Sequence, residues 1–278
     1  MSMIQKAMKQ TSLSVVVPLY NEEENLPVLH RELVAATEGR FSSVEFLFIN
    51  DGSTDGSARV LDRLHQEDPR VKVIHFRKNF GQTAALMAGF DHCQGDLVVS
   101  MDADLQNDPA DIPQVCELLL EGYDMVNGWR KDRQDKLLSR RLPSVMGNRL
   151  ISFITKVKLH DYGCALRGFR REVVKNLFLY GEMHRYLPAL ASRMGIRSIE
   201  IPVNHRPRRF GSSKYGLSRT YRVILDLITL KYLLSFSHRP LQIFGGIGLL
   251  MTGTGTGLGL YLTLVKYLYN EPISGRPL

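Results

Sequence analysis

A short apolar run that ends in two carboxylates is the part of the sequence best suited to chemistry. Residues 97–106 read LVVSMDADLQ. Such a run is typical of a buried parallel strand, and ligands of open α/β sheets bind beyond the carboxyl ends of the strands. Because alternate residues leaving a strand point the same way, we expect Asp102, Asp104 and Gln106 to face one point. Oxygen ligands of this kind suit Mg²⁺ or Mn²⁺ together with substrate phosphates, whereas the plainer alternative is a turn that caps the next helix.

A second acidic residue follows another apolar run. Residues 44–49 (VEFLFI) predict a strand, and residues 50–57 (NDGSTDGS) follow it as a turn before a helix over residues 58–65. Asp51 would then end a strand of the same sheet as Asp102. A carboxylate at such a strand end can hydrogen-bond to a ribose or a base, and it can also serve as a helix-capping group.

The elements that must position these residues alternate between strand and helix. Apolar runs predict strands at residues 13–18, 71–76 and 124–128, and an edge strand at residues 197–203, which contain a proline. Helices are expected over residues 83–93 and over residues 109–121, where Pro109 lies in the first turn. A further helix is expected to follow the loop of residues 19–25, with Asn21 as its N-cap. This order predicts an α/β fold with a mostly parallel, Rossmann-like sheet.

Basic segments follow the predicted sheet. Residues 137–158 have helical apolar spacing with basic residues between, which fits either a helix at a membrane surface or one packed on the domain. Residues 161–170 are expected to form a glycine-containing loop. Residues 205–215 predict a basic loop that closes on phosphates, with a solvated loop as the alternative.

The C-terminal part of the sequence predicts a membrane segment. Residues 221–236 have the pattern of an amphipathic helix, and residues 241–265 contain no charge, a length sufficient to cross a bilayer. Basic residues concentrate before this run, which places the large N-terminal part in the cytoplasm. We therefore expect a catalytic domain over residues 1–215, a juxtamembrane amphipathic helix over 216–240, a transmembrane helix over 241–268 and a tail over 269–278.

The composition restricts the classes of molecule that the protein is expected to bind. Lys and Arg number 36 and Asp and Glu 28, a net charge of +8 that favours nucleic acid, phosphorylated substrates or an anionic membrane face. The three cysteines have no metal-site spacing, which indicates a reducing compartment. Residues 1–10 have no apolar segment of a signal peptide. A nucleic-acid binder would explain the charge but not the carboxylates at strand ends, so we expect no nucleic-acid partner.

Six short motifs occur in order along the chain. They are residues 18–22 (PLYNE), 51–55 (DGSTD), 79–82 (NFGQ), 102–106 (DADLQ), 161–164 (DYGC) and 211–215 (GSSKY). Taken together, these motifs resemble the family 2 glycosyltransferases, and within them the group that acts on polyisoprenyl phosphates. The resemblance implies a Rossmann-like, nucleotide-sugar-binding fold of the glycosyltransferase A type. Members of the undecaprenyl type usually carry at least two C-terminal spanning helices, whereas this sequence has one such run.

The resemblance implies three groups of site residues. One group would hold Mg²⁺ or Mn²⁺ against the donor pyrophosphate, namely Asp102, Asp104 and Gln106. A second would bind donor and lipid phosphates, namely Arg130, Arg208 and Lys214, while Asp104 could orient the acceptor. The third would bind the nucleotide, namely Pro18, Tyr20, Glu22, Ile49, Asp51, Ser53, Asp102 and Ala103.

The activity implied by the resemblance is the inverting, metal-dependent transfer of a sugar from a nucleotide sugar to undecaprenyl phosphate. The favoured donor is a UDP-sugar. The expected location is the inner (cytoplasmic) membrane, with membrane lipids as partners and a homo-oligomer as a further expectation. The alternatives are a GDP-mannose-dependent dolichol-phosphate mannose synthase, a processive polysaccharide synthase and a non-enzymatic nucleotide-sugar binder. A processive synthase should show a Gln-x-x-Arg-Trp segment, yet the single tryptophan, Trp129, follows Val-Asn-Gly.

Overall fold

The structure is a computed structural model with two units, Met1–Leu227 and Ile228–Leu278. It describes residues 3–131, 151–152, 155, 157–207, 228–229, 231–232, 235–236 and 239–269. The predicted amphipathic helices over residues 137–158 and 221–236 lie largely outside the described residues. So does most of the basic loop over residues 205–215, including Arg208 and Lys214.

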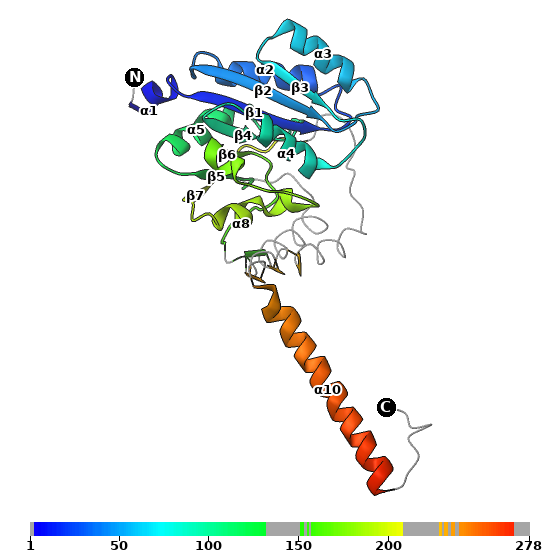
Figure 1. Cartoon of the computed structure of the whole chain (residues 1–278). Helices are drawn as coiled ribbons and strands as arrows, with labels where there is room; N and C mark the ends of the chain where they lie inside the picture. Colours follow the sequence, from blue (N-terminus) through cyan, green and yellow to red (C-terminus); the bar gives the residue numbers. More distant parts are fainter. Residues whose placement is uncertain are drawn as a thin grey trace. The chain divides into compact units, whose positions relative to one another are not determined.

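The first unit alternates strands and helices as the sequence predicts (Figure 1). The predicted strands and helices begin and end within a few residues of the expected bounds, whereas α1, α7, η3 and α8 were not predicted. Residues 167–170, expected in a loop, form an additional strand. In chain order the elements are α1 (Met3–Met8), β1 (Ser12–Leu19), α2 (Leu26–Thr37), β2 (Ser43–Asn50), α3 (Ser57–Glu67), β3 (Val71–His75), α4 (Gln82–His92), β4 (Leu97–Ser100), η1 (Pro109–Asp111), α5 (Ile112–Leu120), β5 (Met125–Trp129), β6 (Arg167–Arg170), α7 (Arg171–Lys175), η3 (Met183–Tyr186), α8 (Leu187–Ser192) and β7 (Ser198–Pro202).

The described strands form one sheet in the order β3-β2-β1-β4-β6-β5-β7. β1 pairs in parallel with both β2 and β4, and β6 runs antiparallel to its neighbours β4 and β5. After β1 the chain adds β2 and β3 on one side of β1. After β3 it crosses to the other side of β1 and forms β4. In sheets of this kind, such a reversal opens a crevice at the carboxyl ends of the strands. The predicted mostly parallel sheet and the edge position of β7 are confirmed.

Helices cover both faces of the sheet, as a buried parallel sheet requires. α4 packs so closely on β1 that a Cβ added at Gly89 would lie 2.2 Å from Val16 Cγ1. On the other face α5 approaches β6, where a Cβ at Gly168 would lie 2.2 Å from Val115 Cγ1. Every second residue of β1, starting at Leu13, belongs to the main apolar core, together with residues of α2, α3 and α5. This packing fixes the strand ends that carry the predicted site.

The prediction that Asn21 caps the following helix is wrong. α2 begins at Leu26, and Asn21 adopts a left-handed backbone with φ 56°. Its side chain instead binds the turn after β2, because its Oδ1 accepts the Thr54 N–H at 2.8 Å. Glu23, in the same loop, accepts the Gly56 N–H at 2.6 Å just before α3. The loop after β1 is thus tied to the loop after β2.

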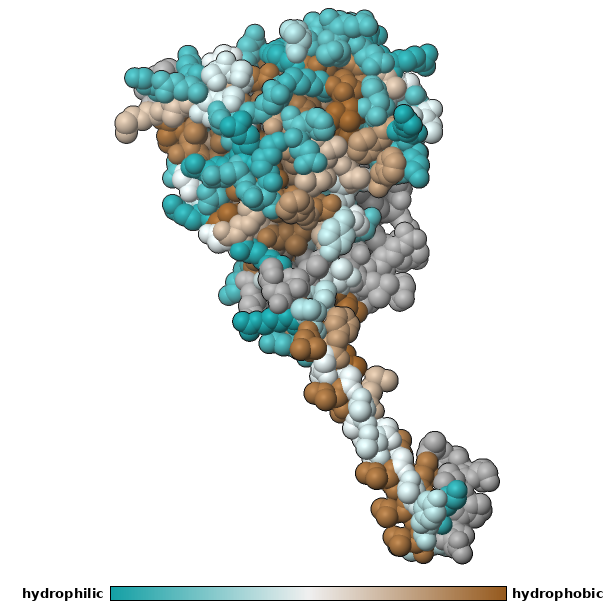
Figure 2. Space-filling model, in the orientation of Figure 1, coloured by the Kyte–Doolittle hydropathy of each residue, from teal (hydrophilic) through white to brown (hydrophobic). Residues whose placement is uncertain are grey.

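The second unit contains a long apolar helix, α10 (Pro240–Leu268). The helix has 29 residues. Its most apolar window of 18 residues has a mean hydropathy of 1.3 and contains no buried residue. At 1.5 Å per residue the helix is roughly 43 Å long, against a hydrocarbon thickness of about 30 Å. Figure 2 shows apolar side chains exposed along this helix. By length and composition it is long and apolar enough to span a membrane.

Candidate active site

Six of the eight residues predicted to bind the nucleotide lie at the carboxyl ends of β1 and β2, whereas Asp102 and Ala103 follow β4. Pro18 and Ile49 are register partners in the two strands. The Asp51 N–H donates to the Leu19 carbonyl at 2.9 Å, and Ser53 Oγ accepts the Asn21 N–H at 2.9 Å. Tyr20 and Glu22 belong to the same loop and are partly exposed. The structure therefore brings this predicted group together, and its contact with a nucleotide stays a prediction.

Asp51 shapes a third loop at this edge. Its two carboxylate oxygens accept the N–H groups of Phe80 at 2.7 Å and Gly81 at 2.9 Å, and burial raises the pKa of this carboxyl. Gly52, with φ 66°, passes so close that a Cβ would lie 2.3 Å from the backbone carbon of Lys78. Only glycine fits there, because both the backbone angle and the contact exclude a side chain. Asp51 thus holds residues 79–82 in place.

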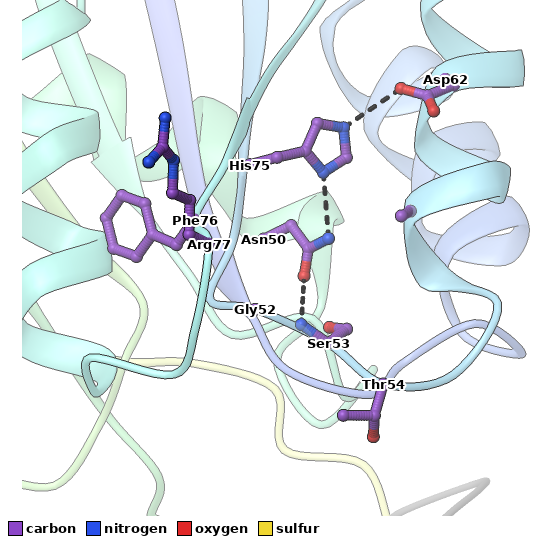
Figure 3. A pocket seen from close by; sticks show the side chains of 9 residues that line it. Asn50, Gly52, Ser53, Thr54, Asp62, His75, Phe76 and Arg77 are labelled. Atoms are coloured by element: carbon purple, nitrogen blue, oxygen red, sulfur yellow. Dashed lines mark hydrogen bonds and ion pairs between the residues drawn. The ribbon is translucent and has the colours of Figure 1, made fainter.

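A hollow lies beside this loop, between the ends of β2 and β3 and the start of α3 (Figure 3). It has a volume of about 400 Å³ and includes Asn50, Ser53 and His75 in its lining. His75 lies between two partners, with Nδ1 3.0 Å from Asn50 Nδ2 and Nε2 3.1 Å from Asp62. Asn50 Oδ1 accepts the Ser53 N–H at 2.9 Å. These contacts support the turn that carries Ser53.

Asp102 and Asp104 follow β4, but not in the expected extended geometry. β4 ends at Ser100, and Leu105 has a left-handed backbone with φ 61°. The chain therefore does not continue as an extended strand through residue 106, and the Gln106 N–H donates to Asp104 Oδ1 at 3.2 Å. That Asp102, Asp104 and Gln106 face one point stays a prediction. Ala103 between the aspartates is buried.

The two carboxylates still influence each other. Burial raises the pKa of Asp102, and the negative charge of Asp104 raises it further. Among the described residues no group of three or more His, Cys, Asp or Glu side chains could hold a metal alone. Two carboxylates nevertheless fit Mg²⁺ or Mn²⁺, which commonly take the remaining ligands from substrate phosphates and water. Placing a positive ion there would also relieve the repulsion between the two carboxylates.

Gln82 is a site residue that sequence reasoning missed. As the first residue of α4 it donates from Nε2 to Asp102 Oδ1 at 2.8 Å. The next residue, Thr83, places its Oγ1 2.7 Å from His184 Nδ1 and so fixes the start of the helix. The only signal in the sequence was its place in the NFGQ motif. Gln82 orients the carboxylate that is predicted to hold the metal.

Arg130, predicted as a phosphate ligand, lies just after β5 in a buried ion pair. Its Nε donates to Asp161 Oδ2 at 2.7 Å and its Nη2 to Asp161 Oδ1 at 2.9 Å. The side chains are 15% and 3% exposed. The hydrogen bonds and charge of Asp161 raise the pKa of Arg130 despite burial, so its charge is fixed. A Cβ at Gly163 would lie 2.8 Å from Arg130 Nη2, which explains the glycine there.

Arg167 is a second buried cation at the same edge, and it was not predicted as a site residue. It pairs with Ser100 across β6 and β4, two residues before Asp102. Its guanidinium donates to the carbonyls of His184 at 2.9 Å and Tyr162 at 2.7 Å, and burial lowers its pKa. The charges of Arg130 and Arg167 both act to lower the pKa of Asp102. Acidic and basic groups therefore share one end of the sheet.

The first residues of the predicted basic loop are bound to the segment after Asp104. Asn107 and His205 form a β-bridge, and the Arg206 N–H donates to the Gln106 carbonyl at 2.9 Å. Arg206 also pairs with Asp108 at 2.6 Å. Arg208 and Lys214, which follow, lie outside the described residues, so their predicted contact with phosphates remains a prediction.

Comparison with known proteins shows the family of the chain. Residues 14–178 match Glycosyl transferase family 2. The chain is 41% identical over 274 residues to a dodecaprenyl-phosphate galacturonate synthase of Rhizobium johnstonii, covering 96% of this chain and 80% of the relative. It is also 41% identical over 236 residues to an undecaprenyl-phosphate 4-deoxy-4-formamido-L-arabinose transferase of Edwardsiella ictaluri, covering 84% and 72%.

Solved structures support the fold. A glucosyl-3-phosphoglycerate synthase from Mycobacterium tuberculosis, in complex with Mn²⁺, UDP and phosphoglyceric acid, has a TM-score of 0.66 at 18% identity and covers 84% of this chain and 83% of that one. A mannosyltransferase from Pyrobaculum calidifontis, with GDP-Man and Mn²⁺, has a TM-score of 0.54 at 18% identity and covers 95% and 88%. The fold is thus that of the glycosyltransferase A type. The chain is a glycosyltransferase that belongs to family 2, in the group formed by the polyprenyl-phosphate sugar transferases.

Proposed function

We propose that the chain transfers a single sugar from a nucleotide sugar, with UDP as the favoured nucleotide, to a polyprenyl phosphate. One observation carries the proposal: at the crevice of the sheet Asp102 follows β4 and accepts a hydrogen bond from Gln82 at 2.8 Å, while the buried cation Arg167 pairs with Ser100, two residues before Asp102. Such a site can bind both the phosphates of a donor and the cation that accompanies them. Two 41% identical relatives are named for sugar transfer involving dodecaprenyl and undecaprenyl phosphate, which supports this acceptor class.

The expected reaction is a direct displacement at the anomeric carbon. An oxygen of the lipid phosphate forms a bond to this carbon, while the bond to the nucleoside diphosphate breaks with its electron pair. The configuration is inverted. Because the lipid phosphate is already anionic near neutral pH, it needs little help from a general base. The main demand is to stabilise the negative charge that grows on the leaving diphosphate.

The residues at the crevice suit this demand. Asp102 and Asp104, with Gln106 as the predicted third ligand, would hold Mg²⁺ or Mn²⁺, which supplies positive charge to the diphosphate. Arg130 would bind a phosphate from its fixed position beside Asp161, together with the predicted ligands Arg208 and Lys214. Asp104 could in addition orient the acceptor phosphate.

The acceptor requires the site to work at a membrane surface. We propose that α10 crosses the inner membrane and that the first unit lies in the cytoplasm, because basic residues precede this helix and a single lysine, Lys266, lies near its end. The cytoplasm also supplies nucleotide sugars. This arrangement would let the lipid phosphate arrive at headgroup depth while the donor arrives from solution.

The test is incubation of the purified full chain with undecaprenyl phosphate and a panel of donors. The panel contains UDP- and GDP-linked glucose, mannose, galacturonate and 4-deoxy-4-formamido-L-arabinose, and the lipid products are identified by mass spectrometry. We expect one lipid-linked monosaccharide from a UDP donor, lost in excess chelator and in Asp104→Asn but not in the exposed control Asp91→Asn. A GDP-mannose product would favour the mannose synthase, and a polymer a processive synthase. Donor binding without any product would contradict transfer.

A further inference from the structure

A carboxylate on the edge strand binds the turn that carries Asp161. Glu200 lies on β7, and its side chain is 9% exposed. It accepts the His160 N–H at 3.0 Å and the Asp161 N–H at 2.9 Å. Its Oε2 also lies 2.7 Å from His160 Nδ1. Two consecutive backbone N–H groups therefore donate to the carboxyl group of one side chain, which holds the turn against β7.

This turn determines where the Asp161 carboxylate points. Asp161 Oδ1 accepts the Gly163 N–H at 3.0 Å within the turn and the Arg130 Nη2–H at 2.9 Å. Its Oδ2 accepts from Arg130 Nε and, at 3.3 Å, from the Arg130 backbone N–H. A chain of short contacts thus runs from Glu200 through the turn to the Arg130 guanidinium.

The other side of the turn is fixed as well. The His160 ring stacks on Trp129, with 4.4 Å between ring centroids and an interplanar angle of 19°. Trp129 directly precedes Arg130, and Glu200 pairs in register with Asn127 of the same strand. Arg130 and the turn are consequently held by the same pair of strands, β5 and β7.

From this geometry we infer that Glu200 is a positioning residue for Arg130: it fixes the turn whose Asp161 sets the plane of the guanidinium. The inference rests on the proposed function, which gives Arg130 its role in binding phosphate. A bidentate contact to phosphate requires a fixed plane, and a displacement of about 1 Å is enough to lose much of the effect. Glu200 itself need not touch the substrate.

Binding measurements on the full chain in detergent test this inference. UDP and GDP, each with Mn²⁺, are compared with uridine and guanosine, which lack the phosphates. In Glu200→Gln the dissociation constant of the preferred nucleoside diphosphate should rise about tenfold, while that of its nucleoside stays unchanged. Glu121→Gln, an exposed substitution after α5, is the matched control and should change neither. Glu200→Asp keeps the carboxylate, so its dissociation constant for the nucleoside diphosphate should lie between those of Glu200→Gln and the wild type. This variant takes the place of Glu200→Gln if the latter does not fold.

A double variant separates positioning from general loosening. If Glu200 acts through Arg130, Glu200→Gln should add little to the loss caused by Arg130→Lys. Additive losses, an unchanged diphosphate affinity, or an equal loss for nucleoside and diphosphate would each overturn the inference. Because these readouts are binding constants, failure of the wild type to transfer sugar to undecaprenyl phosphate would contradict the proposed function without affecting them.

Discussion

Removing the Asp161 carboxylate should destabilise the first unit much more than loss of an exposed charge. Asp161 is 3% exposed and Arg130 15%, and two hydrogen bonds of 2.7 and 2.9 Å join them. Asp161→Asn keeps the shape but leaves a buried guanidinium without its counter-charge, which costs about 3–5 kcal/mol of the free energy of unfolding. At roughly 2–4 °C per kcal/mol for a domain of this size, Tm should fall by roughly 6–20 °C.

The assay is thermal unfolding of the purified chain, read by tryptophan fluorescence, since Trp129 directly precedes Arg130. The control is Glu67→Gln, which removes an exposed ion pair with Arg63 at 3.8 Å and should cost less than about 1 kcal/mol. In Arg130→Met/Asp161→Asn no buried charge is left unpaired, so most of the lost stability should return. Transfer should stay low in this double variant, because methionine cannot bind phosphate.

Two results would refute this reasoning. A Tm change in Asp161→Asn no larger than that of Glu67→Gln would mean that solvent screens the Arg130 charge. A double variant as unstable as the sum of both single variants would mean that each side chain acts independently of the other.

Three further predictions follow from the same contacts. Asp104→Asn should lower the transfer rate by orders of magnitude with Tm nearly unchanged; full activity of the variant, or of the wild type in excess chelator, would contradict a metal role. Gln82→Ala, which removes the 2.8 Å hydrogen bond to Asp102, should raise the Mn²⁺ concentration for half-maximal rate about 10–100-fold; an unchanged metal dependence would exclude Gln82 from the site. Asp68 has its pKa lowered by hydrogen bonds from the Arg70 guanidinium, so its stabilising effect is complete above its unfolded pKa of about 3.9 and is lost as the pH falls through the folded value. The Tm difference between the wild type and Asp68→Asn should therefore shrink as the pH falls below about 4; a difference that does not shrink there would contradict the ion pair.

The sequence predicted the parallel strands because their burial leaves a plain pattern. β1 and β2 are eight-residue strands in which most residues are apolar and buried. β6 could not be predicted in this way, since its four residues, RGFR, contain two arginines and one glycine. Arg167 is buried in that strand because backbone carbonyls satisfy its guanidinium, a contact that no local pattern reveals.

The candidate site was predicted in its acidic part and only incompletely in its basic part. Asp102 and Asp104 follow the most evident strand of the sequence, so their location at the crevice could be expected. The positive φ of Leu105, which ends the extended course of the chain after β4, is a conformation that the residue type does not predict. The partners of Arg130 and Asp102, namely Asp161 and Gln82, are separated from them by 31 and 20 residues in the chain. Sequence spacing gives no measure of such distances.

The antiparallel direction of β6 explains how the site acquires both signs of charge. In a parallel sheet every strand brings its carboxyl end to the crevice, and here those ends supply Asp51 and Asp102. β6 runs the other way, so its first residue, Arg167, lies opposite Ser100 at the same edge. The turn before β6 brings Asp161 there too, and with it the ion pair that holds Arg130 after β5. A parallel strand in this place would start at the opposite edge of the sheet and could deliver neither Arg167 nor the turn. The strand that sequence patterns missed is therefore the one that brings positive charge to the carboxylates.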